Sequence, residues 1–239
     1  MKYIIYLLFL SQITQAQQSR FKEGENLYVW ALNGLNMRKL PDAKSDKIAA
    51  LPYGEKVSVQ ANIGVIVAHE VEEFKDFKVK GVWLLVKYGD KEGFVFDGYL
   101  SRLVAPVKSE NGVYSLIEYL KKNIGRKGNI IFTSNYDKKE RKVVKEDEFS
   151  GDPQRGNYEM NFNYGISYYL HIGEGSEETF TFPNVSLYEG YIFAKTIFSL
   201  FDFRYDKSNK KFILDNGETC QFEIFMKEKN LIINGGCNC

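Results

Sequence analysis

The segment GLNMRKLP at residues 34–41 is followed by LPYGEKV at residues 51–57, and together they decide how the first part of the chain folds. Apolar and polar side chains alternate from Leu35 to Arg38, as they do in a strand with one buried face. The Pro-Tyr-Gly triplet at residues 52–54 marks a turn. The pattern therefore predicts a strand, a proline-containing loop and a turn that leads into a further strand.

Short apolar runs between turn residues continue to about residue 104. The segment GVWLLVKYGDKEGFVFDGYLS at residues 81–101 contains two such runs around a polar Gly-Asp-Lys-Glu loop. Aromatic residues make up 15% of the chain, and aromatic side chains favour strands. Many short strands with frequent turns predict a small β-barrel or sandwich.

These segments resemble the bacterial SH3-like (SH3b) domain family over residues 27–104. The resemblance is carried, in order along the chain, by Leu35-Asn36-Met37-Arg38, Pro41, Gly54, Trp83, Val86, Gly93 and Tyr99-Leu100. It implies an SH3-like β-barrel within residues 20–106. Residues 62–80 are longer than a compact connection, so we expect an extra hairpin or a long loop there.

Aromatic side chains are the candidate ligand-binding residues of this barrel. Members of the family bind cell-wall peptide or glycan, or other proteins, through aromatic-lined grooves, and the resemblance implies a similar role here. Such rings offer a large, rigid contact area. The candidates are Tyr53, Trp83, Tyr88 and Tyr99, with Phe94 and Phe96 as further aromatic residues. Trp83 and Phe94 are explained at least as well by the barrel core, whereas Tyr53 and Tyr88 lie beside turns.

Residues 107–112 have the composition of a linker, and we expect an α+β domain at residues 113–239 that resembles no family. The linker carries few apolar side chains that could anchor the two halves to each other. For this reason we expect residues 20–106 to fold on their own.

Two helices are expected in the second half. Apolar side chains at helical spacing over residues 113–124 predict the first, with Ser109 or Asn111 as its cap. Ser186, followed three residues later by Glu189, forms a capping-box pattern that predicts the start of the second.

The strongest strand pattern covers residues 158–172, where every even position is apolar or aromatic. Fifteen residues is long for one strand, so a bend near residues 163–165 is expected. Together with the other strand segments, the pattern predicts an antiparallel sheet with two helices on one face.

Three cysteines, Cys220, Cys237 and Cys239, lie near the end of the sequence. If Met226 pairs with Leu231 across a tight turn, Cys220 lies opposite Cys237, within reach of a disulfide. A bridge from Cys220 to Cys239 remains open as an alternative. Three cysteines fall short of the usual four ligands of a structural zinc site, so no metal is expected.

The first sixteen residues have the pattern of an export signal. Lys2 precedes an eight-residue apolar run at residues 3–10, and Ala16 follows at a suitable cleavage position. The run is too short to cross a membrane as a helix, and no cysteine follows it for a lipid anchor. We therefore expect an exported protein, periplasmic or secreted, without a membrane anchor.

The balance of charges and the lack of a catalytic motif reduce the number of function classes that fit the sequence. The chain has 32 basic and 31 acidic residues, so it has no general attraction for nucleic acid. We find no catalytic motif and expect no cofactor: neither His69 nor His171 is placed like the histidine of a cysteine hydrolase. The sequence favours a non-enzymatic cell-envelope binding or adaptor protein that recognises a wall component or an envelope protein. An exported wall hydrolase and an inhibitor or immunity-like protein are the alternatives.

If residues 1–16 are an export signal, the mature protein begins at Gln17. Intact-mass measurement of the exported protein should give the mass of residues 17–239. Exported protein that still carries Met1 would contradict the signal-peptide interpretation.

Overall fold

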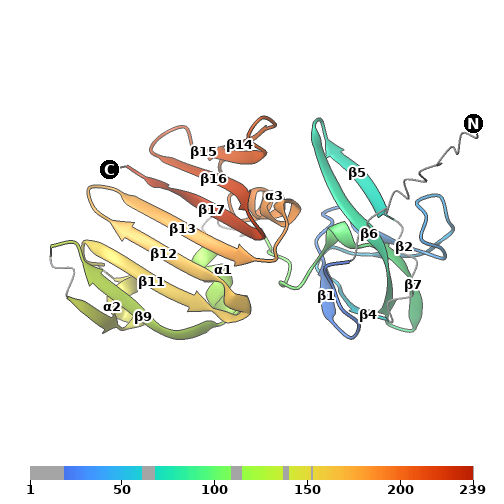
Figure 1. Ribbon diagram of the computed structural model, residues 1–239, viewed down its shortest axis with the longest axis horizontal. Helices are drawn as coiled ribbons and strands as arrows, with labels where there is room; N and C mark the ends of the chain where they lie inside the picture. Colours follow the sequence, from blue (N-terminus) through green and yellow to red (C-terminus); the bar gives the residue numbers. More distant parts are fainter. Residues whose placement is uncertain (1–18, 61–67, 109–114, 137–139, 152, 239) are drawn as a thin grey trace, which may run out of the picture.

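The computed structural model describes residues 19–60, 68–108, 115–136, 140–151 and 153–238. The expected signal at residues 1–16, most of the linker at residues 107–112, and Cys239 lie outside this part of the chain. Within it, the protein is mainly β, with two antiparallel sheets (Figure 1). None of the described helices is long and apolar enough to cross a membrane.

The first sheet forms the expected SH3-like barrel. Its described strands follow the spatial order β3-β2-β7-β6-β4-β1-β8, with β5 paired to β6. Their bounds are β1 (Asn26–Val29), β2 (Leu35–Arg38), β3 (Lys47–Leu51), β4 (Lys56–Val59), β5 (Ala68–Phe74), β6 (Phe77–Tyr88), β7 (Lys91–Phe96) and β8 (Leu100–Ser101), with the short 3-10 helix η1 (Asp97–Tyr99) between β7 and β8. Met37 is fully buried, so it takes the core position expected of it.

Gly93 shows how closely the strands of this small barrel approach. A Cβ at this position would collide with the side chains of Met37 and Ile48 and with the carbonyl oxygen of Arg38. Only glycine allows β7 to pass so near β2 and β3.

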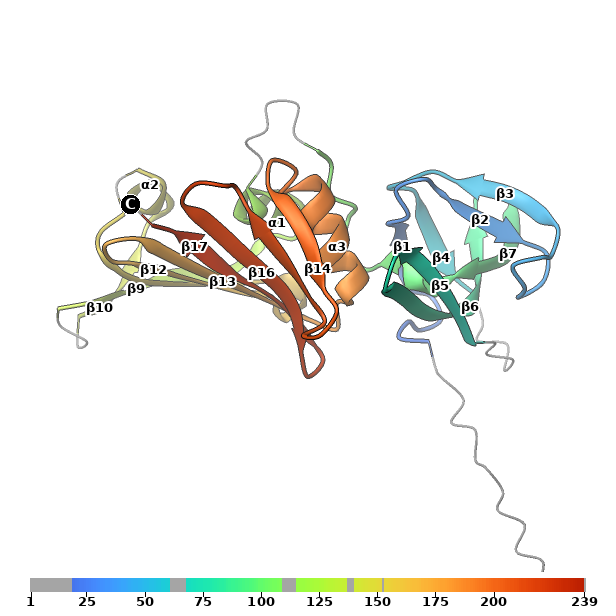
Figure 2. The same ribbon diagram turned by 90° about the horizontal axis from the view of Figure 1, so that it is seen from above.

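The long segment that follows β4 forms an extra hairpin from β5 and the first half of β6. An extra hairpin was one of the two structures expected there, the other being a long loop. β5 runs antiparallel to the first half of β6, from Ala68 opposite Val82 to Phe74 opposite Phe77. This hairpin extends from the barrel towards the second half of the chain (Figures 1 and 2).

The second half is an α+β domain with one antiparallel sheet. Among the described residues its nine strands follow the order β10-β9-β11-β12-β13-β17-β16-β15-β14. The bounds are β9 (Arg126–Ser134), β10 (Arg141–Val144), β11 (Gly156–Phe162), β12 (Ser167–Ile172), β13 (Ser176–Pro183), β14 (Asp202–Asp206), β15 (Lys211–Asp215), β16 (Cys220–Lys227) and β17 (Asn230–Cys237).

Helices α1 (Leu116–Asn123) and α3 (Leu187–Thr196) lie on the same side of this sheet, whereas the short α2 (Glu146–Ser150) lies near its β9 end (Figure 2). Ser186 and Glu189 form the expected capping box at the start of α3. The expected cap of α1 is wrong: Ser115, not Ser109 or Asn111, caps this helix, because Glu118 lies three residues after it and completes a capping box.

The long alternating segment is two strands, β11 and β12, separated by the expected bend. The turn is the 3-10 helix η2 (Asn163–Gly165), in which Tyr164 has a φ of 60°. On β11 the even-numbered residues are buried, and on β12 Tyr168 and Leu170 are buried whereas Ile172 is half-buried.

Aromatic side chains join the two halves. Trp30, fully buried in the barrel, packs edge-on against Phe193 of α3 with 5.2 Å between ring centroids. The hydroxyl group of Tyr188 donates to the Trp30 carbonyl oxygen at 3.1 Å, and that of Tyr119 donates to the Val104 carbonyl oxygen at 2.6 Å. The linker is therefore not the only connection between the halves. Separate folding of the barrel stays a prediction.

A buried carboxylate adds a polar contact between the halves. Glu189 of α3 is 1% exposed, and its Oε2 lies 2.6 Å from a guanidinium nitrogen of Arg20. Its Oε1 accepts a short hydrogen bond from the hydroxyl group of Ser101 in β8. The carboxylate that completes the helix cap thus also holds the barrel.

The cysteine pairing agrees with the predicted register. Met226 lies opposite Leu231 and Cys220 opposite Cys237, across the turn that contains Glu228. A disulfide joins Cys220 to Cys237.

Replacing both Cys220 and Cys237 by Ala should lower the free energy of unfolding, because the bridge closes a loop of 17 residues. The loss of chain constraint amounts to about 3 kcal/mol for a loop of this size. Urea denaturation should show this loss, with Cys239→Ala as the matched control that leaves stability unchanged. Non-reducing peptide mapping that links Cys220 to Cys239 would contradict the assigned pairing.

Candidate functional site

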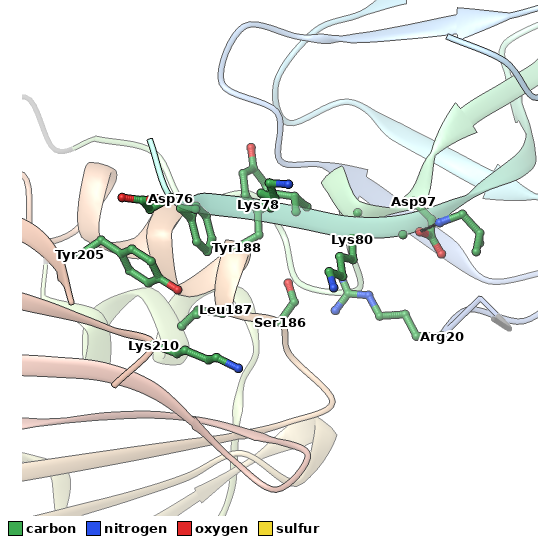
Figure 3. A pocket seen from close by; sticks show the side chains of 15 residues that line it. Arg20, Asp76, Lys78, Lys80, Asp97, Ser186, Leu187, Tyr188, Tyr205 and Lys210 are labelled. Carbon is green, nitrogen blue, oxygen red and sulfur yellow. Dashed lines mark hydrogen bonds between the residues drawn. The ribbon is translucent and has the colours of Figure 1, made fainter. Parts of the chain in front are cut away.

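A groove of about 500 Å³ lies where the barrel meets the second domain (Figure 3). One wall is the first half of β6 together with η1. The opposite wall is the start of α3 and the turn between β14 and β15. This volume is within the usual range of ligand-binding sites.

The β6 wall is held in place by aromatic packing. Phe77, at the start of β6, is buried and lies 5.1 Å from the ring of Phe212 and 5.2 Å from that of Tyr205. The neighbouring Phe74 of β5 lies 5.4 Å from the ring of Tyr191. The tip of the β5–β6 hairpin is therefore packed against the second domain.

Asp97 fixes the other end of this wall. Its Oδ1 accepts the main-chain N–H of Val82 at 2.7 Å, and its Oδ2 accepts the hydroxyl group of Ser19 at 2.7 Å. Burial raises the pKa of Asp97, and these two hydrogen bonds and the charge of Arg20 partly counteract that rise. Gly81 leaves the necessary space, since a Cβ there would collide with the Asp97 carboxylate.

The opposite wall comes from the first residues of α3. Ser186, Leu187 and Tyr188 line the groove, and Figure 3 shows them facing β6 across it. The ring of Tyr188 lies 4.9 Å from that of Tyr99, whose hydroxyl group donates to Glu73 at 2.8 Å. Burial raises the pKa of Tyr99 above its usual range, and the carboxylate of Glu73 adds to the rise, so Tyr99 stays neutral.

The lining carries more basic than acidic groups. The basic residues are Arg20, Lys78, Lys80 and Lys210, against the acidic Asp76 and Asp97. Asp76 is paired with Lys207 of the second domain, with 2.7 Å between the charged atoms. Three of the basic groups are paired as well: Arg20 with Glu189 at 2.6 Å, and Lys78 and Lys80 with Glu70 at 2.8 Å and 3.5 Å. Lys210, which has no ion pair among the described residues, and the exposed ammonium group of Lys80 are therefore the groups that an acidic ligand can contact.

The four aromatic residues expected to bind ligand do not form one surface. Trp83 is 7% exposed and lies opposite Phe96, whose ring is 5.1 Å from that of Tyr99. Tyr53 is half-buried and donates its hydroxyl hydrogen to the Pro106 carbonyl oxygen at 2.6 Å.

Tyr88 is half-buried at the end of β6, in the hairpin with β7. None of the four is among the residues that line the groove. Their role in ligand binding stays a prediction.

The sequence held one signal for the groove. The connection at residues 62–80 is unusually long, and its last residues line the groove as the first half of β6.

The described residues bring no catalytic pair together. The ring of His69 lies 5.4 Å from that of Trp83 in the barrel, whereas His171 has its Nδ1 2.8 Å from Asn157 Oδ1 in the other sheet. Cys220 and Cys237 are bonded to each other. No group of three or more His, Cys, Asp or Glu within the described part of the chain could hold a metal ion.

Comparison with known families identifies the barrel. Residues 33–101 match the family model described as bacterial SH3 domain, in agreement with the resemblance found in the sequence. Searches of curated proteins and of solved structures gave no match. The second domain is thus characterised by its geometry alone.

Replacing Asp97 by Ala should destabilise the protein, because the buried N–H of Val82 would lose its acceptor. The cost of such an unsatisfied donor is about 1–3 kcal/mol. Asp97→Asn is the matched control, since its amide oxygen can still accept this hydrogen bond. Urea denaturation curves that show equal losses for both variants would contradict this role of the carboxylate oxygen.

Proposed function

We propose that this chain is an exported, non-enzymatic protein of the cell envelope that acts as a binding or adaptor module. Its ligand, a wall component or an envelope protein, occupies the groove between the bacterial SH3 domain and the second domain. The observation that carries this proposal is the groove itself, whose lining includes Lys210 and the exposed Lys80.

The domain family supports an envelope role. A bacterial SH3 domain suggests a module that binds cell-wall components. The Cys220–Cys237 disulfide supports an oxidising compartment, because disulfides persist outside the reducing cytosol. The apolar run near the N-terminus of the sequence supports export to the periplasm or the medium.

Two alternatives differ from this proposal in class. An exported wall hydrolase needs a nucleophile close to a base, and the contacts described for His69 and His171 include no cysteine. An inhibitor or immunity-like protein would use the same groove or another surface to block a partner. No contact within the described part of the chain favours either alternative over a binding module.

Reversing the charge of the groove should weaken envelope binding. The variant Lys80→Glu/Lys210→Glu places two acidic groups where an acidic ligand would lie, and we expect at least about tenfold weaker binding. The measurement is co-sedimentation of residues 17–239 with purified wall sacculi, and, separately, binding to solubilised envelope proteins on a sensor surface.

Lys44→Glu, an exposed change in the loop between β2 and β3, is the matched control and should bind like the unchanged chain. Equal binding by the groove variant and the control would contradict the assignment of the groove. Release of soluble wall fragments by the protein would favour the hydrolase.

A further inference from the structure

The first half of β6 has one free edge. Residues 77–82 pair with β5 on one side. On the other side, β7 pairs with β6 only as far as Trp83 opposite Phe96, and the chain then turns away into η1. In the described part of the chain no strand pairs with residues 77–81 along that side.

The direction of the main-chain groups follows from two hydrogen bonds. The N–H of Val82 donates to Asp97, on the β7 side, and the carbonyl oxygen of Leu85 accepts from Gln60, on the opposite side. Successive residues of a strand present these groups to alternate edges. The N–H and C=O groups of Lys78 and Lys80 therefore point to the free edge, whereas those of Val79 point to β5.

This free edge forms a wall of the groove. Lys78, Val79, Lys80 and Gly81 all line it, and Leu187 and Tyr188 lie across from them (Figure 3). Edge lysines often serve only to prevent pairing between copies of a protein. Here the second domain lies across the groove from the edge, and the groove leaves space beside β6 for a ligand.

We propose that an extended, acidic segment of a partner protein binds in this groove as an added strand alongside β6. The proposal rests on the envelope-binding function above and specifies its ligand. Up to four main-chain hydrogen bonds, a donor and an acceptor from each of Lys78 and Lys80, would hold the segment. Residues 77–81 span about 17 Å of strand, enough for a segment of five residues.

The chemistry of the groove favours a polypeptide over a glycan. A row of main-chain donors and acceptors at strand spacing matches another extended main chain, which supplies the complementary groups at the same spacing. Lys210 has no ion pair among the described residues, and Lys80 has only an exposed pair with Glu70 at 3.5 Å, so both favour acidic side chains on that segment. Tyr188 and Leu187 offer apolar contact to the alternate side chains.

A proline substitution tests the main-chain contribution. Lys78→Pro removes an N–H that points into the groove and leaves the β5 ladder intact, so the melting temperature should stay close to that of the unchanged chain. Lys78→Thr removes the same charge and keeps the N–H. Both variants lose the lysine charge, and only Lys78→Pro loses the main-chain N–H. The difference in their binding therefore measures the hydrogen bond that this N–H donates to the ligand.

The probe is a random ten-residue peptide library displayed on phage, selected on residues 17–239. We expect acidic sequences to be enriched, and synthetic copies of them to bind Lys78→Pro at least about tenfold more weakly than the unchanged chain, against about threefold for Lys78→Thr. N-methylation at alternate residues of the peptide should abolish binding in one register and spare it in the other.

Three results would overturn the proposal: no enriched peptide, enriched peptides without acidic residues, or equal binding to the Pro and Thr variants. If peptides fail while sacculi or envelope proteins still bind in a way that depends on Lys80 and Lys210, the envelope function stands and only the added strand is wrong. If that binding is also absent, both proposals are wrong.

Discussion

The buried carboxylate of Glu189 is the contact on which the arrangement of the two domains depends. It lies in the first turn of α3, where it completes the cap on Ser186, and it receives Arg20 and Ser101 from the barrel. A carboxylate removed from water needs such partners, because an unpaired buried charge is very costly. The start of α3 can therefore be buried only where the barrel supplies them.

The groove follows from this docking. Because Glu189 and the Trp30–Phe193 contact hold α3 against the barrel, the residues at the start of that helix face β6. The β5–β6 hairpin makes a further contact through Phe77 and Phe212. The two domains thus meet at separate points and leave a space between them, and that space contains the free edge of β6.

Local signals predicted much of the fold. The alternation over residues 158–172, the Ser186 cap and the Cys220–Cys237 register depend on residues close in sequence or on one tight turn, so they were visible in the sequence and the structure confirms them. The sequence did not predict Ser115 as the cap of α1. The helical spacing of apolar residues begins at Val113, upstream of Ser115, and so placed the start of the helix too early, although Glu118 completes a capping box with Ser115.

The sequence by itself determined the two kinds of domain, the SH3-like motif and the strand register that places Cys220 opposite Cys237, because strand alternation, turn residues and caps act over short separations. The tertiary structure alone decided how the domains dock, which aromatic residues become interface and which strand edge remains unpaired. Arg20 and Glu189 are 169 residues apart, and no periodicity links them. Their contact depends on the packing of whole elements, and so does the groove beside Lys78 and Lys80.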